Sequence, residues 1–248
     1  MLTDRQLYAA TAQIYGLGKD SNVPISSGSG MVAKIGGTRY VLTVAHNAER
    51  CERFGVHIDH DLATKGSYMY VTNSYGIVKL LKLGKAGECA VDEIDFTWFN
   101  IPDDCIPKRT SVAPIDGEER IENTEFDLDK GVSPMMSSED YSFAGVIKVK
   151  LASLAGTASY LIKGDLAVHR GFRYERSVDE YHVFKIPYDP FPGHDAFRGC
   201  SGSPILDGSG NPVALVVGSR PDMPFYGVGL QRLCELIRIQ ESGVRPIV

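Results

Sequence analysis

The sequence predicts an all-β protein made of two β-rich halves, with a short helix near each end. Three observations predict it: short β-rich runs recur between turns, a glycine pair marks a tight hairpin, and one proline- and acid-rich stretch separates two groups of runs. Evenly spaced short strands are typical of β-barrels and sandwiches. With 248 residues, 43% of them hydrophobic, the chain can bury a sizeable core.

The first predicted element is a short helix. Residues 3–6 (TDRQ) fit a capping box, and apolar side chains then continue at helical spacing as far as Ile14, before Gly16 ends the helix. Strands are predicted in the runs GSGMVAKI, TRYVLTVAH, SYMYVTN, GIVKLLKLG and DFTWFNI. Gly36 and Gly37 form the predicted hairpin turn between the first two runs.

A long irregular connection is predicted from about residue 102 to 140, which is rich in proline and acid. Strands resume in YSFAGVIKVKLA, ASYLIKG, YHVFKIPY, SPILDGSGNPVALVVGS and FYGVGL. One face of a C-terminal helix follows, formed by Leu230, Leu233, Cys234 and Ile237. We therefore divide the chain into residues 1–112 (helix and first β-unit), 113–140 (linker) and 141–248 (second β-unit and helix).

The composition of the sequence indicates which binding partners and which cellular location to expect. A net charge of -5 gives no general attraction to nucleic acid or to an anionic membrane, so we expect neither as a partner. No run reaches the roughly 18 apolar residues that span a bilayer, and the N-terminus does not resemble a signal peptide. Five scattered cysteines without a C-x-x-C pair predict reduced thiols and a cytoplasmic location. A secreted or host-cell location stays open if a leader precedes this sequence.

Three separate segments carry candidate chemistry. His46 ends the apolar strand YVLTVAH, Asp95 begins the apolar run DFTWF, and Ser201 lies between glycines in GCSGSP. Taken singly, each has an ordinary structural explanation: a strand-end histidine, a turn-forming carboxylate and a small-residue turn.

In this order and context, the three segments resemble the chymotrypsin-like (trypsin-fold) serine protease family. TVAH is similar to that family's T-A-A-H, DFTWF to its D-I-A-hydrophobic strand, and GCSGSP to its G-D-S-G-G-P. The resemblance covers roughly residues 25–230. It implies one peptidase domain of two six-stranded antiparallel β-barrels, with His46 and Asp95 on the first barrel and Ser201 on the second.

The resemblance also implies a role for each residue. Ser201 would attack a peptide carbonyl and form an acyl-enzyme, His46 would act as general base and then acid, and Asp95 would orient His46. The N–H groups of Gly199 and Ser201 would form the oxyanion hole. Such a protease acts on protein or peptide substrates and requires no cofactor and no metal; whether a regulatory partner controls it stays open.

Departures from the family pattern point to a bacterial-type or virus-related member. Cys200 replaces the aspartate that pairs with a freshly cut N-terminus in the digestive enzymes, so that activation switch is absent. Ser203 replaces a glycine, and Asn47 replaces the usual disulfide cysteine. Related viral proteases use a cysteine nucleophile, but Cys200 stands one residue too early for that role, and we expect it to be a partly buried structural thiol.

Substrate preference depends on the residues around the nucleophile. Asp195 stands six residues before Ser201, where trypsin-like enzymes carry the aspartate that binds Arg or Lys, so we expect a basic residue before the scissile bond. Val216 and Gly218 would form a wall that pairs with the peptide, and Gly218 and Gly227 would leave the pocket open. Two alternatives remain: glutamyl-type specificity, or a non-catalytic peptide-binding or scaffold member of the same fold.

Overall fold

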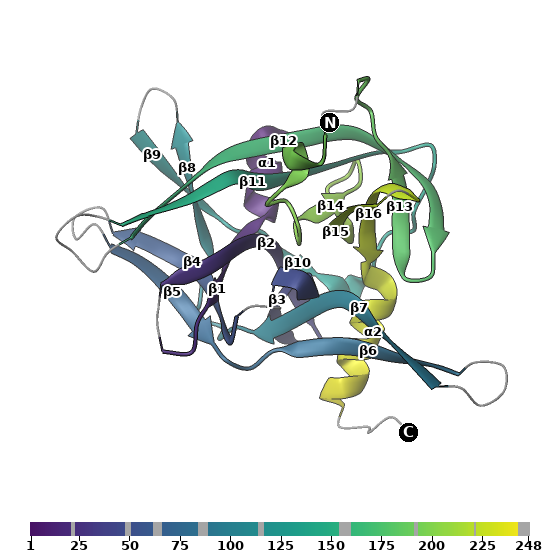
Figure 1. Cartoon of the computed structure of the whole chain (residues 1–248), viewed down its shortest axis with the longest axis horizontal. Coiled ribbons are helices and arrows are strands. Elements are labelled where there is room, and N and C mark those ends of the chain that lie inside the picture. The colour runs from purple at the N-terminus through teal and green to yellow at the C-terminus, as the bar shows by residue number, and fades with distance from the viewer. Residues whose placement is uncertain are drawn as a thin grey trace.

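The computed structural model describes residues 1–20, 23–47, 51–61, 66–83, 89–113, 117–153, 160–190, 193–220 and 222–242. For some strand residues, and for residues 194 and 195, it describes the backbone alone. The chain forms two β-structures placed side by side, with a helix from each end of the chain packed against them (Figure 1).

The first half is a curled, open sheet in the order β5-β4-β1-β2-β3-β7-β6. Its strands are β1 (Ala12–Leu17), β2 (Pro24–Ile35), β3 (Thr38–Thr43), β4 (Arg53–Asp61), β5 (Gly66–Thr72), β6 (Gly76–Leu83) and β7 (Cys89–Asn100). Gly36 and Gly37 form the β2–β3 hairpin as predicted, both with positive φ (59° and 80°), which glycine adopts without strain.

The second half is a closed barrel in the order β11-β12-β13-β16-β15-β14. Its strands are β11 (Asp140–Ser153), β12 (Tyr160–Val178), β13 (Tyr181–Lys185), β14 (Pro204–Leu206), β15 (Pro212–Arg220) and β16 (Met223–Gly229). All the pairs in the barrel are antiparallel. The predicted double β-barrel fold class is confirmed, with the first half curled rather than closed among the described strands.

The segment predicted as an irregular connection contains regular structure. It holds the two-stranded sheet β8 (Lys108–Ala113) and β9 (Gly117–Glu122), the strand β10 (Glu125–Asp127) and the short helix η2 (Leu128–Lys130). β10 pairs in parallel with residues 32–34 of β2. These residues lie beyond Gly30, the last residue of β2 that pairs with β1. It therefore satisfies a stretch of the β2 edge that β1 leaves unpaired.

The N-terminal helix α1 (Asp4–Ala10) has the predicted capping box, in which the Thr3 hydroxyl accepts from the Gln6 N–H and the Gln6 side chain accepts from the Thr3 N–H. The helix stops at Ala10, not Gly16 as the spacing predicted, because Ile14 lies in β1, where pairing with both β2 and β4 outweighs helical propensity. α1 packs against the second barrel, where Leu7 contacts the core formed with Ala144.

The C-terminal helix α2 (Leu230–Glu241) joins the two halves. Figure 1 shows it extending from β16 alongside strands of the first half. It buries the predicted face, Leu230, Leu233, Cys234 and Ile237. These side chains share one hydrophobic cluster with Met31 and Leu42 of the first half and with Leu215 of the barrel, so α2 fixes one half against the other.

Four cysteines whose side chains are described form no disulfide and are buried: Cys51, Cys105, Cys200 and Cys234. The Cys89 side chain lies outside the described residues. Among the helices of the described chain, none has the length and apolar character needed to cross a lipid bilayer.

Candidate active site

Strand register brings His46 and Asp95 together. β3 and β7 are antiparallel, and Thr43 stands opposite Thr97. Continuing that register by two residues places Asp95 beside Ala45, which begins the one-turn helix η1 (Ala45–Asn47). The side chain of His46, the next residue, can therefore reach a carboxylate that lies 49 positions away in sequence.

The Asp95 carboxylate holds His46 at two points. One oxygen accepts from the His46 backbone N–H (2.8 Å), and the other lies 2.6 Å from the ring Nδ1. The backbone N–H of Asp95 donates to the hydroxyl of Tyr181 on β13 (3.1 Å), so the second barrel also positions this strand. Because Nδ1 faces the carboxylate, the tautomer that carries its proton there leaves Nε2 as a base.

Ser201 lies on a turn that only glycines can form. Gly199 and Gly202, on either side of it, have φ values of 99° and 88°. A Cβ on Gly199 would overlap the carbonyl oxygen of Val146, and one on Gly202 would overlap that of Ser29. The turn is fixed to the barrel by the Gly202 N–H, which donates to the Val216 carbonyl (2.7 Å).

The same turn is docked onto the first half, next to His46. The Ser201 carbonyl accepts from the Ser29 N–H on β2 (3.0 Å) and from Asn47 Nδ2 (3.1 Å). The Ser29 hydroxyl donates to the Gly199 carbonyl (3.1 Å). Asn47 directly follows His46, so its side chain connects the histidine segment to the serine turn by a hydrogen bond.

The turn offers three groups that could take part in a reaction: the backbone N–H groups of Gly199 and Ser201, and the Ser201 hydroxyl. Within the described part of the chain, the N–H groups of Gly199 and Ser201 donate to no other group. The Ser201 hydroxyl donates to the carbonyl of Val217 (3.2 Å), which therefore borders the serine directly. A histidine–carboxylate pair, a serine and two unused N–H donors are the groups that acyl transfer requires.

The fold is that of the chymotrypsin-like proteases. The strand topology decides this, since a closed six-stranded antiparallel barrel stands beside a curled antiparallel sheet with terminal helices. No protein-family model matches the chain, and no curated protein matches its sequence.

Several solved protease structures are remotely similar to this chain. The serine endoprotease from Yersinia pestis has 11% identity and a TM-score of 0.47, covering 98% of this chain and 66% of its own. Rv3671c from M. tuberculosis, in an inactive mutant form, has 12% identity and a TM-score of 0.43, covering 98% and 91%. The MamO protease domain from Magnetospirillum magneticum has 12% identity and a TM-score of 0.39, covering 93% of this chain and 97% of its own. This chain thus spans about two thirds of the Yersinia chain, and these likenesses concern the fold.

The predicted specificity residues occupy different environments. The backbone of Asp195 lies in the short helix η3 (His194–Phe197), and its side chain lies outside the described residues. Val216 is buried, and its N–H donates to the Ser203 carbonyl. A Cβ on Gly218 would meet open space, whereas one on Gly227 would crowd the Leu215 carbonyl, so packing explains the glycine at 227.

Cys200 is fully buried, as a structural thiol should be. A Cβ on Gly145 of β11 would stand 2.5 Å from its Sγ, so the thiol packs closely against that strand. Sequence reasoning missed Tyr181 and Ser29, because each reaches the site through the packing of the two halves and lies in no recognisable motif.

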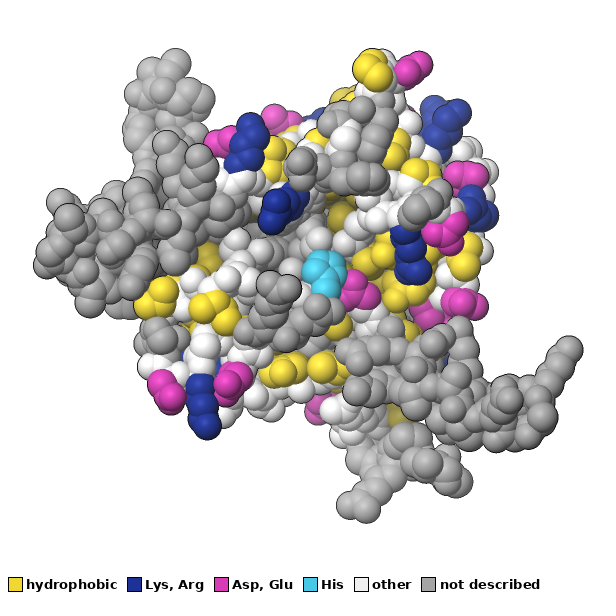
Figure 2. Space-filling view, viewed as in Figure 1, with side chains coloured by type: hydrophobic (Ala, Val, Ile, Leu, Met, Phe, Trp, Pro, Cys, Tyr) yellow, Lys and Arg dark blue, Asp and Glu magenta, His cyan; other side chains and the backbone are white. Residues whose placement is uncertain are grey.

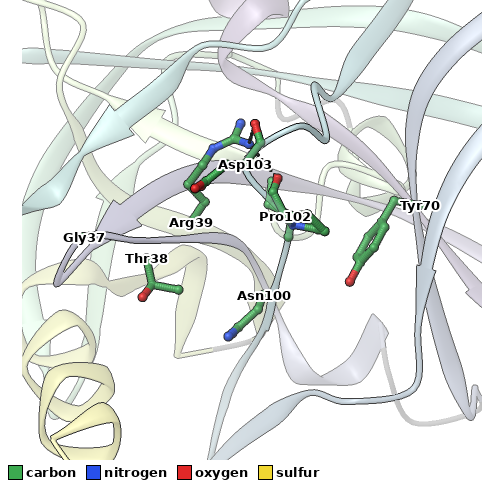
Figure 3. Close-up of a pocket in the computed structure, with 8 residues that line it drawn as sticks. Gly37, Thr38, Arg39, Tyr70, Asn100, Pro102 and Asp103 are labelled. Carbon is green, nitrogen blue, oxygen red and sulfur yellow. Dashed lines mark hydrogen bonds between the residues drawn. The ribbon is translucent and has the colours of Figure 1, made fainter.

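A second concavity is unrelated to this site. It is lined by Thr38, Arg39, Tyr70, Asn100 and the adjoining residues in Figure 3. It lies at the end of β3 opposite His46, and β3 itself rises about 17 Å from Thr38 to Thr43. Its one cation, Arg39, already donates to the carbonyls of Pro102, Asp103 and Cys105 and pairs with Glu125. The pocket therefore offers no obvious recognition group.

Protonation of a buried histidine is expected to destabilise the second barrel. His169 stacks on Phe143 and Phe197, at centroid distances of 4.8 and 4.9 Å, and burial lowers its pKa to about 4. Between pH 6.5 and about 4 the unfolded chain binds a proton that the folded chain does not, so stability present above pH 6.5 falls as the pH drops. The loss is about 3 kcal/mol at pH 4.

Thermal unfolding of the wild type and of His169→Phe, each followed from pH 7 to pH 4, measures how much stability the protein loses through His169. Carboxylates titrate in both proteins, so the difference between the two curves isolates His169. We expect the wild type to lose more stability on acidification than the variant. Parallel curves would show that His169 does not contribute.

Proposed function

We propose that this chain is a serine endopeptidase that cleaves peptide bonds through an acyl-enzyme on Ser201. The observation that carries the proposal is the double attachment of His46 to Asp95, beside the turn that holds Ser201. It supplies an oriented base, a hydroxyl nucleophile and backbone donors on one surface. The His46 and Asp95 side chains are both partly exposed, and Figure 2 shows a histidine next to an acidic side chain at the surface.

The proposed reaction proceeds in two stages. Ser201 Oγ attacks the peptide carbonyl while its proton passes to His46 Nε2, and the oxyanion accepts hydrogen bonds from the N–H groups of Gly199 and Ser201. His46 then protonates the leaving amine as the C–N bond breaks. Water, deprotonated by His46, attacks the acyl-enzyme and releases the new carboxylate, returning the proton to Ser201.

Reaction requires a rotation of the Ser201 side chain. Its hydroxyl here donates to the Val217 carbonyl, and we expect substrate binding to redirect it towards His46, since catalytic hydrogen bonds often form fully only in the Michaelis complex. The vacated Val217 carbonyl would then accept from the substrate backbone, which couples peptide binding to activation of the nucleophile.

Hydrolysis of a peptide library by the wild type and two neighbouring variants tests the proposal. We expect Ser201→Ala to abolish cleavage and Cys200→Ala to retain most of it, because the Cys200 thiol is buried. Loss of cleavage in Cys200→Ala but not in Ser201→Ala would assign the nucleophile to the thiol. No cleavage by the folded wild type would favour a non-catalytic peptide-binding protein.

We further propose that the primary pocket prefers Arg or Lys, on the basis of Asp195, six residues before the nucleophile at the start of η3. In the same library, Asp195→Asn should reduce cleavage after basic residues by about tenfold or more, because a charge-assisted contact contributes more than a neutral one. Cleavage after glutamate by the wild type would overturn this preference.

A further inference from the structure

A basic side chain lies on an aromatic platform next to the His46–Asp95 pair. The rings of Tyr181 and Tyr226 meet edge to face, with centroids 5.4 Å apart. The Arg220 guanidinium carbon lies 4.6 Å from the Tyr226 centroid and 5.6 Å from that of Tyr181. Since the Tyr181 hydroxyl accepts from the backbone N–H of Asp95, this platform adjoins the residue that holds His46.

The charge of Arg220 is held in place but not neutralised. Arg220 is exposed, and within the described residues its guanidinium has no carboxylate partner and no hydrogen bond. Other surface arginines do have such partners: Arg173 of β12 pairs with Asp140, and Arg232 of α2 pairs with Glu180. Stacking restricts the guanidinium without consuming its N–H donors, which leaves them available to an anion.

Arg220 also lies at the end of β15, three residues beyond Val217, whose carbonyl accepts from the Ser201 hydroxyl. β14 pairs with β15 only as far as Leu215, and β16 occupies the opposite edge, with Gly218 against Tyr226 and Arg220 against Met223. The residues of β15 beyond Val217 therefore extend past the end of β14. A Cβ on Gly218 would meet nothing within 4 Å, so no described side chain crowds that face of the strand.

The direction of pairing decides which part of a peptide meets Arg220. A peptide added antiparallel to β15 runs opposite to it, so its chain approaches Ser201 from the Arg220 end. Its residues on the amino-terminal side of the scissile bond then lie along Gly218 to Arg220. Val217 to Arg220 spans about 10 Å, which corresponds to the second to fourth substrate residues before the bond.

We propose that Arg220, stacked on Tyr226 and Tyr181, selects an acidic residue two to four positions before the scissile bond. The inference rests on the proposed function for the position of that bond. It concerns a subsite separate from the primary pocket, so it holds whichever residue occupies that pocket. A carboxylate there would form the ion pair that Arg220 lacks within the protein.

Paired peptides test this subsite. Eight-residue peptides that differ only by Asp or Asn at the second, third or fourth position before a mapped cleavage site are compared by kcat/KM. We expect at least one Asp peptide to be cleaved roughly fivefold faster, the effect of one exposed but preorganised ion pair, and less so at high salt. Arg220→Gln should cleave the Asp and Asn peptides with equal kcat/KM, whereas Arg173→Gln, the matched surface control, should retain the preference for Asp.

A binding measurement separates this inference from the proposed function. Fluorescein-labelled versions of the same peptides are titrated into Ser201→Ala, which needs no catalysis, while a fluorophosphonate probe tests the wild-type nucleophile. Asp preference that disappears in Ser201→Ala/Arg220→Gln supports the subsite even if the probe does not react. Equal binding of Asp and Asn peptides, or no binding, overturns the subsite even if the probe labels Ser201.

Discussion

Asp95→Asn should lower kcat for peptide hydrolysis by about 10⁴-fold while leaving KM nearly unchanged. The carboxylate accepts from both the backbone N–H and the ring Nδ1 of His46. An amide can still accept from the backbone, but its NH₂ group, turned towards the ring, favours the tautomer with the proton on Nε2. His46 then cannot take the proton of Ser201, although the peptide still binds.

Asp140→Asn is the matched control, because Asp140 is a surface carboxylate paired with Arg173 on the barrel. We expect it to keep wild-type kcat and KM. Steady-state kinetics on one cleaved peptide, with circular dichroism to confirm folding, give the comparison. A folded Asp95→Asn protein with wild-type kcat would remove Asp95 from the proposed mechanism.

Gly202→Ala should lower the free energy of unfolding by at least about 3 kcal/mol. The new methyl would overlap the Ser29 carbonyl and Thr43 Oγ1, and φ at this position is 88°. Ser29 and Thr43 are themselves joined by a hydrogen bond of 2.7 Å between the first two hairpin strands. The serine turn would therefore have to move away from the first half.

Gly208→Ala provides the control, because Gly208 lies in an exposed turn of the same barrel and a methyl there meets nothing within 4 Å. Chemical denaturation of both variants measures the difference. We expect Gly208→Ala to stay within about 0.5 kcal/mol of the wild type. Equal stabilities for the two variants would contradict the close docking of the Ser201 turn onto Ser29.

Local sequence signals predicted the elements with strong patterns. The Gly36–Gly37 hairpin, the capping box at Thr3 and the buried face of α2 all follow from residue type and spacing. The end of α1 and the strand β10 could not be predicted in this way, because both depend on pairing between strands that are distant in sequence. β8 and β9 contain charged runs such as EERIE, which carry little strand periodicity.

The candidate site was predictable to the extent that it lies in motifs. His46, Asp95 and Ser201 each end or begin a recognisable segment, and strand register explains why the first two meet. Asn47 was noted only as a missing cysteine, and its bond to the Ser201 carbonyl depends on how the halves dock. The Arg220 platform combines residues from β13, β15 and β16, an arrangement that no single stretch of sequence encodes.

Mapping the site of a fluorophosphonate adduct tests the central proposal most directly. The folded wild-type protein is treated with the probe, digested, and sequenced by tandem mass spectrometry. We predict one adduct on Ser201, absent from Ser201→Ala and strongly reduced in Asp95→Asn. An adduct on Cys200, or an unmodified Ser201 in folded protein, would contradict the assignment of this chain as a serine peptidase.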